Sequence, residues 1–315
     1  MIRALLIQGV QMALVLLLAP LLTGLVRKVK ARLQRRRGPP LIQPYRDLRR
    51  LLGKEVVLAE NASWLFRVAP YMVFALTWVA ASLVPTFATG LLFSWSGDLI
   101  VIIALLGSAR FMLALAGMDI GTSFGGIGSS REVMIASIAE PAMLMIVLSL
   151  AIIAGSTQLS TISAFMASSA AGLRVSLALA LVAFVIVALA ENARIPVDNP
   201  ATHLELTMVH EAMVLEYSGR HLAMIELAAS VKLLLYISAI GCIFFPFGLA
   251  DGDATGFAAY LLKLAVAGVM LGTFETSIAK MRVFRVPEFL GAALMLGLLA
   301  TLLLFVSGSL KACTV

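Results

Sequence analysis

The chain has 315 residues, of which 61% are hydrophobic and 13% are charged, and its mean hydropathy is +1.01. Soluble domains carry about 25% charged residues, so this composition excludes an ordinary soluble protein and predicts a membrane protein. The net charge of +7 is then expected to face anionic lipid or partner surfaces rather than nucleic acid.

Eight apolar runs are long enough to cross about 30 Å of hydrocarbon. They cover roughly 5–26, 68–92, 98–118, 133–154, 173–191, 221–246, 257–279 and 288–307. The first run is too long for a signal-peptide core and no small-residue cleavage site follows it, so we interpret it as a retained span. No repeat or low-complexity linker divides the chain. We therefore expect an all-α integral membrane protein, with residues 1–315 forming a single polytopic domain.

Basic residues set the expected orientation. Loop 27–67 holds twelve Lys and Arg residues. Six more lie in the other loops on the same side: Arg131, Arg194, Arg220, Lys280, Arg282 and Arg285. Because cytoplasmic loops carry such an excess, we expect these loops in the cytoplasm and both termini outside, in a bacterial or archaeal cytoplasmic (inner) membrane.

The first basic loop also carries an amphipathic pattern. Tyr45, Leu48, Leu51 and Leu52 fall at helical spacing, with charged residues between them. This pattern predicts a short helix lying on the bilayer surface. A solvated basic anchor accounts for most of it, and composition alone does not show that a partner docks there.

Two local motifs on the cytoplasmic side are incomplete. "DIGTSFGGIGSSRE" (119–132), in the loop before the fourth run, lacks the Gly-Lys-Ser/Thr ending of a phosphate loop and follows no strand. Its glycines instead predict close approach of backbone to backbone or to a partner. "VHEAMVLE" resembles the zinc motif His-Glu-x-x-His, but Val214 stands where the second histidine should be. The first stretch is therefore not expected to bind a nucleotide, and the second is not expected to form a zinc-hydrolase site.

The loop between the fifth and sixth runs gathers many ionisable residues: Glu191, Arg194, Asp198, His203, Glu205, His210, Glu211, Glu216 and Arg220. Pro196 and Pro200 forbid a continuous helix, so the fifth span should end near Glu191–Arg194 in an extended turn. Thr202 and Glu205 match a capping box, which predicts a charged helix from there to about Tyr217, stopping at Gly219. A capped interfacial helix with solvated charges is one interpretation of this loop.

Six charged residues inside the apolar runs weigh against that interpretation: Arg110, Glu140, Glu226, Lys232, Lys263 and Glu275. At 1.5 Å per residue, the three carboxylates lie about 8–12 Å from the cytoplasmic ends of their spans. Each such charge costs a few kcal/mol in hydrocarbon, so it normally faces a partner or a hydrated cavity. One or two could be structural ion pairs, whereas six suggest a polar path suited to proton handling.

The redox chemistry of the chain itself is limited by its two cysteines, Cys242 and Cys313. An iron–sulfur cluster needs about four ligands, and no histidine lies inside a long apolar run, where a membrane haem would be bound. We expect no cofactor and no metal in this chain. Any electron transfer would then use centres on other chains or a diffusible carrier.

Several motifs occur in a fixed order along the chain. "RRGPPLIQPYRDLRRLLGKE" holds Gly38, Pro39, Gln43, Pro44, Asp47, Lys54 and Glu55; "FRVAP" spans 66–70; Arg131 and Glu140 have Arg-x8-Glu spacing; "ENARIPVD" holds Glu191, Arg194, Pro196 and Asp198; and "LEYSG" holds Glu216, Tyr217 and Gly219. In this order they resemble the subunit 1 family of respiratory complex I. That family has relatives in membrane-bound group 4 NiFe hydrogenases and formate hydrogenlyases.

This resemblance implies a non-catalytic membrane subunit that seats a hydrophilic redox arm and links electron transfer to proton or sodium translocation. Iron–sulfur clusters and a NiFe site would lie on hydrophilic cytoplasmic partners, with antiporter-like membrane subunits alongside. The implied path residues are Arg110, Glu140, Glu191, Arg194, Asp198, Glu205, Glu216, Glu226, Lys232 and Glu275. The implied docking residues are Arg35, Arg36, Arg37, Gly38, Pro39, Gln43, Asp47 and Arg131.

Two alternatives remain open from the sequence. Quinone-reducing members are rich in acidic residues just after the motif's Asp, where this chain reads "NPATH" (199–203). This departure favours the hydrogenase-type branch over a quinone-binding subunit of an NADH:quinone oxidoreductase. A stand-alone ion antiporter would explain the buried charges, but it would not explain the basic first loop or the ordered motifs.

Overall fold

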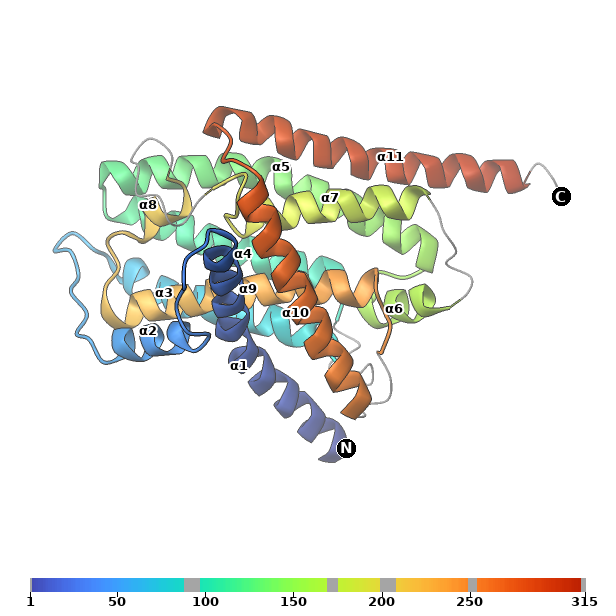
Figure 1. Ribbon diagram of the computed structural model, residues 1–315. Coiled ribbons are helices and arrows are strands. Elements are labelled where there is room, and N and C mark those ends of the chain that lie inside the picture. Colours follow the sequence, from blue (N-terminus) through green and yellow to red (C-terminus); the bar gives the residue numbers. More distant parts are fainter. Residues whose placement is uncertain (1, 88–96, 169–174, 199–207, 249–253, 313–315) are drawn as a thin grey trace.

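The computed structural model describes residues 2–87, 97–168, 175–198, 208–248 and 254–312. Their regular structure is helical, apart from one isolated bridge between Asp98 and Gln158. In chain order (Figure 1) the elements are α1 (Ile2–Leu33), α2 (Gln43–Leu52), α3 (Trp64–Leu83), α4 (Leu99–Asp119), α5 (Ser123–Ala154), α6 (Leu159–Ala167), α7 (Val175–Glu191), α8 (His210–Val214), α9 (Gly219–Ile243), α10 (Ala254–Ser277), the 3-10 turn η2 (Val283–Arg285) and α11 (Val286–Ala312).

The predicted all-α membrane fold is confirmed. Seven of the described helices are long and apolar enough to cross a membrane: α1, α3, α4, α5, α9, α10 and α11. The remaining predicted run corresponds to α7, which is apolar but has 17 residues. Such a helix spans about 26 Å, slightly less than a full hydrocarbon core. The count of eight crossings therefore stays a prediction.

The helices form a bundle with one oblique pair. α11 lies along α5 and α7, and α3 packs against both α4 and α9. α1 and α10 lie side by side and cross the other long helices at an angle (Figure 1). Gly272 of α10 allows this contact, because an added Cβ would lie 2.9 Å from Val29 of α1. Small residues serve the same purpose at many membrane helix contacts.

Capping residues set two helix starts that hydropathy placed too late. The Ser63 hydroxyl accepts a hydrogen bond from the Leu65 amide (3.1 Å), and α3 begins at Trp64. Thr122 likewise accepts from the Gly125 amide (3.2 Å), and α5 begins at Ser123. These are ordinary N-caps. The prediction that 119–132 is a loop was therefore wrong for most of that stretch.

We call the end of the molecule that carries the Lys- and Arg-rich residues 27–67 the basic end. It includes α2 and α8, which both lie at the left in Figure 1. The predicted amphipathic helix after the first span is confirmed as α2. The start of α1 and the end of α11 lie away from this end in the figure. Large apolar side chains such as Leu17, Phe111 and Met270 are exposed on the outer helix faces, as expected for surfaces that contact lipid.

The helix predicted from Thr202 to Tyr217 is corrected by the structure. Thr202 and Glu205 lie outside the described residues, but Met208 and Val209 are not helical and α8 ends at Val214. Tertiary bonds hold this backbone in place of a local helix. Arg131 donates to the Met208 carbonyl (2.8 Å), and the Asp198 carboxylate accepts from the Val209 amide (3.3 Å).

Gly219 opens a helix rather than closing one, so the predicted stop at this residue was also wrong. It is the first residue of α9 and has φ +54°, a conformation that favours glycine. An added Cβ would lie 2.5 Å from the Glu55 carbonyl oxygen. Gly219 therefore lets the start of α9 approach the loop that follows α2.

Candidate functional site

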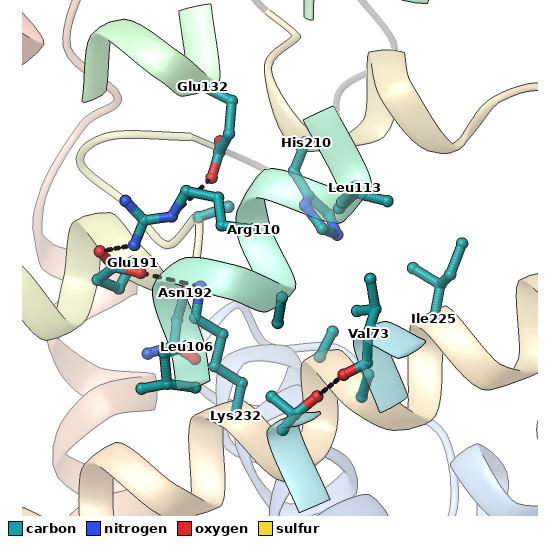
Figure 2. Close-up of a pocket in the computed structure, with 15 residues that line it drawn as sticks. Val73, Leu106, Arg110, Leu113, Glu132, Glu191, Asn192, His210, Ile225 and Lys232 are labelled. Atoms are coloured by element: carbon teal, nitrogen blue, oxygen red, sulfur yellow. Dashed lines mark hydrogen bonds and ion pairs between the residues drawn. The ribbon is translucent and has the colours of Figure 1, made fainter. Parts of the chain in front are cut away.

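The buried charges of four helices meet at Arg110 of α4 (Figure 2). Its guanidinium forms ion pairs with Glu132 (3.5 Å) and Glu140 (3.6 Å), both on α5, and with Glu191 at the end of α7. Lys232 of α9 lies 2.9 Å from the other Glu191 oxygen. We refer to these five residues as the Arg110 network.

The spacing of residues on α5 explains part of this arrangement. Glu132 and Glu140 are eight positions apart, about two helical turns, so both side chains lie on the same face of α5. That face packs against α4. Gly107, near Arg110 on α4, leaves room for Glu140, because a Cβ there would lie 3.2 Å from the Glu140 Oε1 atom.

The network has three carboxylates and two cations. The side chains of Arg110 and Glu191 are 6% and 3% exposed, whereas that of Glu140 is 44% exposed. The network thus has one more carboxylate than cations.

A small cavity of about 80 Å³ adjoins the network. Its polar wall includes Arg110, Glu132, Glu191 and Lys232, and its apolar wall includes Val73, Leu113 and Ile225 (Figure 2). One water needs about 10–15 Å³ of such space and two or more polar partners. The cavity therefore suits several waters in contact with both charged and apolar walls.

A wide cavity of about 680 Å³ lies between the small cavity and the basic end. Its walls come from α1, α2, α8, α9 and the segment 192–198. Its charged lining residues are Arg27, Lys30, Arg36, Asp47, Arg194, Asp198, Glu211 and Glu226. Five residues line both cavities: Asn192, Ala193, His210, Ile225 and Ala229. The two spaces therefore adjoin at these five residues.

Ion pairs fix the segment 192–198 against α1 and the end of α10. Glu275 is 4% exposed and pairs with Lys30 (2.7 Å) and Arg194 (3.4 Å). Lys280 pairs with Asp198 (2.8 Å). Burial lowers the pKa of the Arg194 guanidinium below its ordinary value, and the facing Glu275 carboxylate opposes that shift. The segment thus forms one wall of the wide cavity.

The structure brings together most of the path residues predicted from the sequence. Arg110, Glu140, Glu191 and Lys232 meet in the Arg110 network. Arg194, Asp198 and Glu226 line the wide cavity, and Glu275 pairs with cations that line it. Glu216 is half-buried, lines neither of these cavities and forms no ion pair within the described ranges. Glu205 falls outside those ranges.

Four of the eight predicted docking residues line the wide cavity. Arg36, Gly38, Pro39 and Asp47 line it, and the Gln43 amide donates to Asp47 (3.0 Å). Arg35, Arg36 and Arg37 are exposed. Arg131 instead reaches inward to the Met208 carbonyl, so in this chain it positions the segment before α8.

Sequence reasoning assigned no role to Glu132, Asn192 and His210, which all line the small cavity. For Glu132 a signal was present: once Thr122 is recognised as the cap of α5, Glu132 and Glu140 share a helix face. The other two residues belong to irregular backbone or a very short helix. No periodicity could place their side chains.

Comparison with known proteins gives a consistent result. Residues 6–306 match a family described as NADH dehydrogenase. The chain is 32% identical to formate hydrogenlyase subunit 4 of Escherichia coli (strain K12), over 89% of this chain and 92% of that protein. It is 34% identical to hydrogenase-4 component C of the same strain, over 86% and 87% of the two chains.

Two more distant proteins extend the comparison. The chain is 28% identical to NADH-quinone oxidoreductase subunit 8 of Rhodothermus marinus, over 82% of this chain and 78% of that protein. A chain in the structure of the membrane-bound sulfane sulfur reductase, an archaeal respiratory membrane complex, has a TM-score of 0.82 at 19% identity. That match covers 96% of this chain and 99% of the other. At this identity, the likeness shows the fold alone.

Proposed function

Since the chain belongs to the NADH dehydrogenase family, we propose that it is a membrane subunit of a complex I-like oxidoreductase of the hydrogenase type. The names of the two Escherichia coli relatives described above refer to formate hydrogenlyase and to hydrogenase-4. In this proposal the chain seats soluble redox subunits at its basic end. It links their electron transfer to proton or sodium translocation across the membrane.

The Arg110 network is the observation that carries the coupling proposal. It has one more carboxylate than cations, and waters in the adjoining cavity could deliver a proton to it. The wide cavity leads from the basic end to the same place. A sodium ion would compete with Arg110 and Lys232 for the carboxylate oxygens, whereas a proton needs only one oxygen. We therefore favour protons.

The partners follow from charge and exposure. Soluble subunits carrying iron–sulfur clusters and a NiFe centre would bind the exposed arginines 35–37, and this chain would supply no redox centre. An antiporter-like membrane subunit would cover α4 and α5, where Glu140 has a side chain 44% exposed and Ser108 and Ser137 are exposed. A carboxylate at membrane depth normally faces a polar partner rather than lipid.

A quinone-binding role is a second candidate, favoured by the wide cavity alone. Its volume of about 680 Å³ lies within the range of roughly 300–1,000 Å³ typical of small-molecule sites. Its lining combines apolar Leu48 and Leu222 with polar Asp47 and His210. Quinone-dependent turnover of the purified complex would support this candidate, and turnover independent of quinone would contradict it.

The coupling proposal is tested with Glu140→Gln in the intact complex. Glu140 has the most exposed side chain in the network. When it is replaced, Arg110 keeps its ion pairs with Glu132 and Glu191, so the variant should assemble. We expect redox activity with an artificial acceptor to stay normal. Turnover-driven acidification in proteoliposomes should fall about tenfold or more, since general acid–base groups contribute about 10²–10⁴-fold.

Glu288→Gln is the matched control, because Glu288 is exposed at the start of α11 and lines neither cavity. It should remain fully coupled. Full coupling in Glu140→Gln and in Glu191→Gln would contradict proton transfer through this network. Loss of assembly in both variants would instead indicate that the pairs are structural, since breaking a buried pair costs about 3–5 kcal/mol.

A further inference from the structure

His210 occupies the boundary between the two cavities. It is the first residue of α8 and is half-buried. In Figure 2 its ring lies near Leu113, and the Arg110 side chain extends away from it toward Glu191. The other residues shared by the two linings are Asn192, Ala193, Ile225 and Ala229. Within the described ranges, His210 is thus the one titratable side chain that lines both cavities.

The rest of this boundary offers little to a proton. Ala193, Ile225 and Ala229 have apolar side chains. The Asn192 amide donates to the Ala188 carbonyl (2.8 Å), and an amide does not titrate near neutral pH. An imidazole, by contrast, accepts a proton on one ring nitrogen while it releases one from the other. His210 is therefore suited to proton transfer across the boundary.

Proton donors and acceptors stand on both sides of the ring. Glu211 and Glu226 line the wide cavity, and Glu132 and Glu191 line the small one. Just before His210, Arg131 donates to the Met208 carbonyl and Asp198 accepts from the Val209 amide. The backbone just before His210 is thus held by bonds that do not involve the imidazole, and carboxylates line the cavity on each side of it.

We propose that His210 relays protons between the wide cavity and the Arg110 network. One ring nitrogen accepts a proton from water in the wide cavity, and the other nitrogen releases its proton to water in the small cavity. One proton enters and one leaves, so the ring returns to neutral and then resets by ring rotation or tautomer exchange. This inference rests on the proposed function, because it needs a proton flux toward the network.

The test uses the complete complex in proteoliposomes with His210→Ala and His210→Gln. In both variants, turnover-driven acidification should fall at least about tenfold, toward the roughly 10²–10⁴-fold that a general acid–base group contributes. Assembly and artificial-acceptor activity should be retained. Added imidazole should restore acidification in His210→Ala. Rescue by substituted imidazoles should follow their pKa values rather than their volumes, which a space-filling role would not produce.

His221→Gln is the control histidine. His221 packs edge-on against Tyr71 (ring centroids 5.5 Å apart) and lines neither cavity, so this variant should remain coupled. Normal coupling in both His210 variants, with Glu140→Gln uncoupled, would overturn the relay and leave the proposed function intact. Normal coupling in all of them would overturn both. Reduced acidification in His210→Ala with normal acidification in His210→Gln would show that the ring only fills space, and it would overturn the relay.

Discussion

At the residue scale, glycines determine how closely α8 can approach α4 and α5. A Cβ at Gly128 would lie 2.9 Å from the Ala212 Cβ and 3.0 Å from the Val209 carbonyl oxygen. A Cβ at Gly125 would lie 2.1 Å from the Gly117 carbonyl oxygen. These are the close backbone contacts predicted for the glycine-rich stretch. The Gly128 contacts support α8, and with it His210, against the start of α5, whereas the Gly125 contact brings α5 close to α4.

Gly128→Ala should therefore destabilise the protein and displace α8. Overpacking at such a contact typically costs about 1–3 kcal/mol, so we expect a lower melting temperature in detergent and reduced coupling. Gly126→Ala is the matched control, because nothing lies within 4 Å of its added Cβ. Alanine is about 1 kcal/mol better than glycine within a helix, so that variant should be as stable or slightly more stable. Equal melting temperatures for the two variants would contradict this account.

At the element scale, hydropathy located the helices but not their ends. α3 was predicted to reach residue 92, yet it ends at Leu83, and Val84 is extended before Pro85. A residue before proline disfavours the helical region, a local rule that the apolar run concealed. The segment around Met208 could not be predicted at all, because its conformation depends on bonds from Arg131 and Asp198, which are distant in sequence.

The site was predictable in part for a physical reason. A charge within an apolar run needs a partner, so Arg110, Glu140 and Lys232 could be selected from sequence alone. Their pairing could not be predicted, because it depends on how α4, α5, α7 and α9 pack. Glu132 was missed because α5 was predicted to start too late. His210 was missed because its position depends on two cavities that no sequence pattern reveals.

Asp198→Ala should loosen α8 without unfolding the bundle. The Asp198 carboxylate accepts from the Val209 amide and pairs with Lys280, and hydrogen bonds to charged groups contribute about 1.5–3 kcal/mol each. Amide hydrogen exchange in 208–214 should therefore become about tenfold faster or more. Helix α3 should exchange as in the wild type. Glu60→Ala, at an exposed acid in the loop before α3, should change neither region. Unchanged exchange in 208–214 of Asp198→Ala would contradict a role of Asp198 in holding this backbone.

At the scale of the whole molecule, the polar features form a series that starts at the basic end. Arginines 35–37 are exposed, and Arg36 also lines the wide cavity. His210 lies where this cavity adjoins the small cavity and the Arg110 network. The rest of the exterior is dominated by apolar side chains on the long helices. Membrane retention and docking are thus assigned to different parts of the chain, which makes them separable by mutation.

Replacing Arg35, Arg36 and Arg37 with Ala should release the soluble redox subunits while the chain itself stays in the membrane. The three side chains are exposed, and interactions of exposed charges weaken as salt rises, so release should occur at lower salt than in the wild type. Membrane retention should persist because the apolar helices provide it. A matched triple variant of Arg46, Arg49 and Arg50 on α2 removes the same charge and should retain the soluble subunits. Immunoblotting of washed membranes measures the soluble subunits and the chain itself. A docking role would be contradicted if the Arg35, Arg36 and Arg37 variant kept the soluble subunits at the salt concentrations that the wild type tolerates. It would also be contradicted if that variant lost only the chain.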